Sequence, residues 1–186
     1  WLARRDSPVW QASPGAGHYA LARLEQSGRL HTLVTQNIDG LHQLAGSADE
    51  RVIEIHGTLR QVACLQCNYR VAMAVVLKRL ADGEEDPDCP ECGGILKSAT
   101  ISFGQSLVAK DLARAEQAAH ECDLLLAVGS TLSVFPVAGL VPLARKAGAR
   151  VVIINAEPTA MDEFGDAVLM GDIELLLPQL IAQSEN

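Results

Sequence analysis

The strongest constraint on the fold of this chain is a set of four cysteines arranged as two CxxC pairs. The first pair is Cys64 and Cys67, and the second is Cys89 and Cys92. Each pair can form a knuckle that presents two thiolates to one point, and two knuckles at this separation favour a single tetrahedral zinc ion. Because four thiolates complete the coordination shell, we expect the zinc to be structural rather than catalytic.

Composition narrows the class of protein. The 186 residues suffice for one domain that carries a small insertion, and 48% of them are hydrophobic. The net charge of −8 argues against nonspecific binding to nucleic acid or to an anionic membrane. The apolar runs have the length of strands and are too short to span a membrane. CxxC pairs that act as metal ligands are typical of a reducing compartment, so we expect a cytoplasmic protein, and we expect it to be a monomer.

Short aliphatic runs alternate with helical patterns, which predicts an α/β fold with a parallel sheet covered by helices on both faces. The expected strands cover residues 30–35, 52–55, 99–103, 124–128 and 150–154. The expected helices cover residues 16–27, 72–80, 107–121, 137–147 and 173–183. Ligands of such folds bind beyond the carboxyl ends of the strands, so these ends are the places to search for function.

Small or polar residues follow three of these strands. They are Gln36, Asn37 and Asp39 after the first, Gly129, Ser130 and Thr131 after the fourth, and Asn155 and Glu157 after the fifth. The first group suits a sugar or a carboxamide, although it could instead cap a helix. The second allows backbone N–H groups to approach a phosphate. The third suits ribose hydroxyls or a simple turn. Together the three groups favour a nucleotide ligand.

His56 follows the apolar run 52–55 and precedes a glycine, which places it at the end of a strand. An imidazole titrates near neutrality, so His56 suits a general base at a nucleotide site. Zinc ligation and a purely structural role are the alternatives, but four cysteines already complete a zinc shell.

These motifs resemble those of sirtuins, which are NAD-dependent protein-lysine deacylases. The matching segments are 35–42, His56-Gly57, the two CxxC pairs, Phe103-Gly104, 128–134 and 154–159. Segment 96–105 is similar to bacterial members, particularly actinobacterial ones. The resemblance implies a Rossmann-like NAD-binding domain formed by residues 1–57 and 98–186, with a small zinc-ribbon domain at 58–97.

The resemblance also implies residue roles. NAD would be held by Gln36, Asn37, Ile38 and Asp39 at the nicotinamide end, by Gly129, Ser130 and Thr131 near phosphate and ribose, by Asn155 and Glu157 at the adenosine ribose, and by Ile173 at the adenine. Phe103, Gly104, Ser133 and Val134 would hold an acylated-lysine peptide as an added strand.

In the implied reaction, nicotinamide leaves as the acyl oxygen attacks the ribose, and His56 deprotonates a ribose hydroxyl. Collapse of the intermediate with water then gives free lysine and O-acyl-ADP-ribose, with acetyl as the expected acyl group. A noncatalytic binding module built on the zinc ribbon and protein ADP-ribosyl transfer are the alternative functions.

The sequence departs from the sirtuin pattern in one respect. The first strand and its Gly-Ala-Gly loop, which cradle the NAD pyrophosphate, are not found in this chain. The segment Ser13–Gly17 is glycine-rich, but no expected strand precedes it, so we interpret it as a connector into a helix. We therefore expect the chain to be the C-terminal portion of a sirtuin and to bind NAD poorly by itself.

Overall fold

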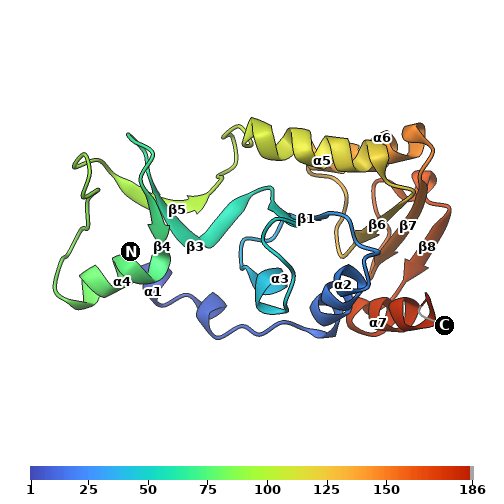
Figure 1. Cartoon of the computed structure of the whole chain (residues 1–186), viewed down its shortest axis with the longest axis horizontal. Helices are drawn as coiled ribbons and strands as arrows, with labels where there is room; N and C mark the ends of the chain where they lie inside the picture. Colours follow the sequence, from blue (N-terminus) through green and yellow to red (C-terminus); the bar gives the residue numbers. More distant parts are fainter. Residues whose placement is uncertain (185–186) are drawn as a thin grey trace.

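The computed structural model describes residues 1–184 and contains parallel and antiparallel strands in separate regions (Figure 1). In one parallel pair, β1 (Leu33–Thr35) lies beside β2 (Val52–Glu54). A three-stranded parallel sheet follows the order β6 (Leu124–Val128), β7 (Arg150–Asn155) and β8 (Ala167–Met170). The parallel strands and the helices between them confirm the predicted α/β class.

Helices cover both faces of the β6–β7–β8 sheet. On one face, α5 (Ala109–Glu121) packs against α6 (Leu140–Ala147), and on the other α2 (Ala16–Gln26) packs against α7 (Ile173–Ser184) (Figure 1). Successive residues of a strand point to opposite faces, and β7 supplies apolar side chains to both layers. Val151 and Ile153 pack in one hydrophobic cluster with residues of α6, whereas Ile154 packs with residues of α2 and α7.

The cysteine-bearing part of the chain forms an antiparallel sheet of order β4 (Arg70–Ala72), β3 (Gly57–Cys64) and β5 (Leu96–Thr100). Helix α4 (Met73–Ala81) packs on it, and the buried side chains there are Val62, Cys64, Met73, Val76, Cys89 and Leu96. The N-terminal segment adds two side chains to this cluster: Trp1, which precedes α1 (Leu2–Arg5), and Trp10, which ends the short 3-10 helix η1 (Pro8–Trp10).

The helix boundaries follow the sequence signals closely. Helix α2 begins after Gly15 and ends before Gly28, whose φ of +76° suits a glycine. The remaining short elements are α3 (Leu41–Leu44), η2 (Val137–Gly139) and η3 (Asp162–Phe164).

The prediction of a strand over residues 99–103 is wrong in its bounds, because the observed strand β5 covers Leu96–Thr100. Pairing explains the shift: Cys64 lies opposite Leu96 and Gly57 lies opposite Thr100, so β3 fixes both ends of β5. Phe103 lies beyond the strand and is 100% exposed. In the described residues, no helix has the length and apolar character needed to cross a membrane.

Candidate functional site

His56 lies in a two-residue turn between β2 and β3, at the carboxyl end of a parallel strand. Its Nδ1 is 3.1 Å from the backbone oxygen of Gln36, which follows the neighbouring strand β1. A carbonyl oxygen can only accept a hydrogen bond, so this contact assigns the imidazole proton to Nδ1. The arrangement leaves Nε2 as the nitrogen that can accept a proton.

Position 57, next to this histidine, favours glycine over every other residue type. Its φ of +74° is left-handed, and a Cβ built there would lie 2.1 Å from the backbone oxygen of Ala99. The close approach lets the chain just after β5 bind the turn, since the N–H of Ile101 donates to the His56 oxygen at 2.8 Å. These contacts therefore fix the backbone of the His56-Gly57 turn against the antiparallel sheet, whereas the contact with the Gln36 oxygen orients the imidazole.

The segment after β1 is held by short-range hydrogen bonds. The buried Thr35 hydroxyl accepts from the N–H of Asn37 at 3.1 Å, and Asp39 Oδ1 accepts from the N–H of Leu41 at 2.9 Å. The Asp39 carboxylate thus satisfies a donor in the first turn of α3, which is the capping role considered from the sequence. The N–H of Leu59 donates to the Ile38 oxygen at 2.8 Å and ties this segment to β3.

Three strand ends converge on one place. Gln36 Nε2 donates to the Ser130 hydroxyl at 3.2 Å, which joins the segment after β1 to the segment after β6. Gly129 has a φ of +63°, its N–H donates to the Ile154 oxygen of β7 at 2.9 Å, and a Cβ there would lie 3.1 Å from Ile173 Cδ1. The structure therefore brings together predicted cofactor-binding residues from three separate segments, namely Gln36, Gly129 with Ser130, and Ile173.

The other predicted residues lie around this cluster on the surface. Asn155 Nδ2 donates to the Glu157 oxygen at 2.7 Å, and the hydroxyls of Thr131 and Ser133 are 2.8 Å apart. The residues predicted to hold a peptide, namely Phe103, Gly104, Ser133 and Val134, are all exposed. Their roles, like those of the individual NAD-binding residues, stay predictions.

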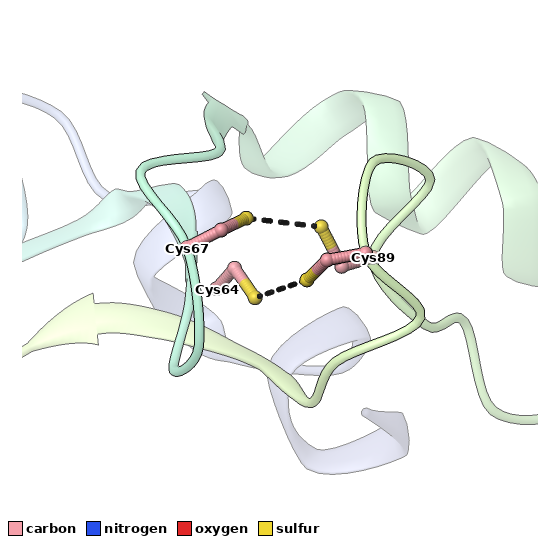
Figure 2. A group of neighbouring side chains, drawn as sticks. Cys64, Cys67 and Cys89 are labelled. Atoms are coloured by element: carbon pink, nitrogen blue, oxygen red, sulfur yellow. Dashed lines mark hydrogen bonds between the residues drawn. The ribbon is translucent and has the colours of Figure 1, made fainter.

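The four cysteines that were predicted to bind zinc meet at one point (Figure 2). Their sulfur atoms lie within 4.8 Å of one another, and the pairs Cys64–Cys92 and Cys67–Cys89 are 3.6 Å apart. Sulfurs bound about 2.3 Å from a tetrahedral zinc would be separated by about 3.8 Å, so the cluster has the dimensions of a zinc site.

The backbone around the cysteines favours thiolates. The N–H of Gln66 donates to Cys64 Sγ at 3.3 Å and lowers the pKa of that thiol to about 7. The N–H of Tyr69 likewise lowers the pKa of Cys67, but desolvation and the three neighbouring thiols outweigh it and raise this pKa to about 12. Four thiolates therefore need a cation at their centre, and the site fits one structural zinc ion.

Two residues near the site carry no signal that sequence reasoning could use. Burial raises the pKa of Glu54, which precedes His56 by two residues on β2. Arg60 on β3 donates through Nε to the backbone oxygen of Asp39 at 2.8 Å. A single arginine in a strand matches no motif, so only the folded chain shows this contact.

Comparison with known proteins identifies the family. The sequence model of the Sir2 family matches residues 2–136, well over half of the chain. The chain belongs to the Sir2 family. A Streptomyces coelicolor relative named NAD-dependent protein deacetylase 2 is 47% identical over 181 residues, which cover 97% of this chain and 75% of that protein. The Streptomyces origin of this Sir2-family relative confirms the similarity to actinobacterial members that segment 96–105 predicts.

Other Sir2-family proteins give the same result. NAD-dependent protein deacetylase 1 of Bradyrhizobium diazoefficiens is 45% identical, and the match covers 87% of this chain and 63% of that protein. A solved structure described as Sir2 bound to acetylated peptide has a TM-score of 0.90 at 29% identity and covers 99% of this chain and 76% of that one. The chain therefore spans between 63% and 75% of the length of these two curated relatives.

Proposed function

We propose that the protein carrying this chain is an NAD-dependent protein-lysine deacylase whose principal substrates carry acetyl groups. The observation that carries the proposal is the orientation of His56, whose Nδ1 faces the Gln36 oxygen and leaves Nε2 as a base. Membership of the Sir2 family supports it, because the curated relatives are named NAD-dependent protein deacetylases.

The strand ends offer a surface that suits NAD. Gly129 brings its backbone close to Ile173, and a Cβ at this position would occupy the space between them. Gln36 and Ser130 place an amide and a hydroxyl side by side at the same edge. We propose that these residues hold the dinucleotide, with Asn37 and Asp39 at its nicotinamide end and Asn155 and Glu157 at its adenosine ribose. Bound NAD supplies a ribose carbon from which nicotinamide can depart.

His56 performs proton transfer in this proposal. Because the Gln36 oxygen holds the proton on Nδ1, Nε2 is ready to accept a proton from a hydroxyl group. Gly57 and the hydrogen bond from Ile101 hold the backbone of the turn that carries the ring. Positioned general bases of this kind contribute roughly 10²–10⁴-fold to a reaction rate.

The zinc centre has a structural role in this proposal. Four cysteine sulfurs leave no ligand position for substrate, so the metal would hold β3, β5 and the two knuckles together. His56 is connected to this region through β3, which begins at Gly57 and ends at Cys64. We also propose that the protein works in the cytoplasm, a compartment that suits its five free cysteines, and that it is a monomer.

Product analysis tests the proposal. The protein that carries this chain is incubated with NAD and an acetyl-lysine peptide, and the products are identified by mass spectrometry. We expect nicotinamide, deacetylated peptide and O-acetyl-ADP-ribose in equal amounts. An ADP-ribosylated peptide that keeps its acetyl group would indicate transferase activity instead, and an unchanged mixture would refute both readings.

A further inference from the structure

Arg60 makes three contacts that converge on one turn of the candidate NAD site. Its Nε donates to the backbone oxygen of Asp39 at 2.8 Å. Its aliphatic stem lies against Gly40, where a Cβ would come within 2.9 Å of Arg60 Cγ. Its guanidinium carbon lies 5.3 Å from the centre of the Trp10 ring, within cation–π range.

The turn that Arg60 contacts joins the predicted nicotinamide-binding segment to helix α3. Gly40 has a φ of +69° and accepts a hydrogen bond from the N–H of Leu44 at 3.2 Å. Glycine permits the left-handed backbone at this turn, but it also has more accessible backbone conformations than other residues, so it does little to hold the turn in one of them. The Arg60 contact adds a bond from β3 to the hydrogen bonds that Asp39 and Gly40 make within the turn itself.

Arg60 is itself held in place from two sides. Its strand, β3, pairs with both β4 and β5, and its N–H donates to the Thr58 hydroxyl at 3.2 Å. On the other side, Trp10 is fixed because its indole N–H donates to the Arg4 oxygen at 2.7 Å. The guanidinium is thus clamped between an anchored ring and the Asp39 carbonyl, and a charged donor makes a stronger bond than a neutral one.

We propose that Arg60 is a positioning residue that fixes the Asp39-Gly40 turn for NAD binding. The proposal rests on the proposed function and deepens it, because Arg60 contacts the backbone of the NAD-binding segment rather than NAD itself. It makes the antiparallel sheet and the N-terminal segment contribute to the nicotinamide end of the site. A change in either region that displaces Arg60 would then weaken NAD binding without touching an NAD-binding side chain.

Three variants test the proposal in the protein that carries this chain. Arg60→Ala removes the clamp, and Arg60→Lys keeps the charge but lacks an Nε donor at the required place. Arg5→Ala is the matched control, because Arg5 is an exposed arginine that pairs with Asp6. For each variant, amide hydrogen exchange is measured by mass spectrometry over residues 36–41, and KM and kcat are measured with NAD and an acetyl-lysine peptide.

We expect Arg60→Ala to accelerate exchange at residues 36–41 about tenfold and to raise KM for NAD about tenfold, since one charge-assisted hydrogen bond is lost. The KM for peptide should stay unchanged, kcat should change less than about twofold, and Arg60→Lys should behave like Arg60→Ala. Arg5→Ala should match the wild type in every measurement.

Other outcomes overturn the proposal. Unchanged exchange at residues 36–41 would show that Arg60 does not hold the turn. Equal losses for NAD and peptide would indicate a general structural defect, and full recovery with Arg60→Lys would indicate an effect of charge alone. A wild-type protein without NAD-dependent deacylation would refute the proposed function and the positioning role with it, whereas the exchange measurement would still report whether the clamp exists.

Discussion

Replacing Gly57 with alanine is a quantitative test of how tightly the His56 turn is packed. A Cβ at position 57 would lie 2.1 Å from the Ala99 oxygen, whereas real Cβ contacts essentially never fall below 3.0 Å. The two backbones must therefore separate by roughly 1 Å in a close-packed region. Gly28 provides a matched control, because its φ of +76° is almost the same as the +74° of Gly57 but no atom lies within 4 Å of its Cβ position.

The two substitutions separate backbone strain from steric overlap. A left-handed φ costs a non-glycine residue about 1–2 kcal/mol, and this cost applies to both variants. Overlap in a packed region adds about 1–3 kcal/mol, and only Gly57→Ala incurs it. We therefore expect Gly28→Ala to lower the free energy of unfolding by about 1 kcal/mol and Gly57→Ala to lower it by about 3 kcal/mol.

Urea denaturation followed by circular dichroism measures both changes. The m-values should match that of the wild type, so that differences in midpoint report stability alone. Equal destabilisation by Gly57→Ala and Gly28→Ala would refute the close packing of the His56 turn against β5.

Three further predictions concern the metal, pH and an ion pair. Elemental analysis should find one zinc per chain. Cys64→Ser should lose this zinc together with the structure of the antiparallel sheet. A Cys64→Ser protein that keeps a full equivalent of zinc would contradict the four-cysteine site. Burial, with a contribution from His18, lowers the pKa of His42 from 6.5 to about 4. Between pH 6.5 and pH 4 the unfolded chain binds a proton at this histidine and the folded chain does not, so the free energy of unfolding falls as the pH falls through this window. His42→Asn should therefore flatten the pH dependence of the urea midpoint between pH 6.5 and pH 4. An unchanged pH dependence would contradict the lowered pKa. The N–H of Val151 and then Arg145 lower the pKa of Asp166, so Asp166→Asn should destabilise the protein at pH 7 and lose its effect as the pH falls below 3.8; a penalty that persists in acid would point to a cause other than the charge.

The sequence predicts most of the longer helices and four of the five parallel strands because local signals define them, but the expected strands do not include β8. Gly28 and Gly148 both have positive φ and end their helices at the expected places. The strand 124–128 matches β6 fully, because a continuous aliphatic run marks a strand of a parallel sheet. The carboxyl ends of β1 and β6, where ligands of such folds bind, meet at the hydrogen bond between Gln36 and Ser130, although the two strands belong to separate sheets.

The antiparallel sheet was harder to predict because pairing between distant residues defines it. The sequence of β3 mixes polar and apolar residues, and the register of β5 depends on the opposition of Cys64 and Leu96. The contact of Arg60 with Asp39 joins positions 21 residues apart and leaves no periodic signal. Motif spacing predicts the chemistry of the site, whereas the residues that hold the site in place are defined by contacts between distant positions.

The central role of His56 is tested most directly by replacing it with tyrosine and measuring NAD-dependent release of nicotinamide in the presence of an acetyl-lysine peptide. His120→Tyr serves as the matched control, because His120 is exposed near the end of α5. We expect His56→Tyr to lose about 100-fold or more of the turnover while its zinc content and urea midpoint stay at wild-type values, and we expect His120→Tyr to remain fully active. Wild-type turnover in His56→Tyr would contradict the assignment of His56 as the general base.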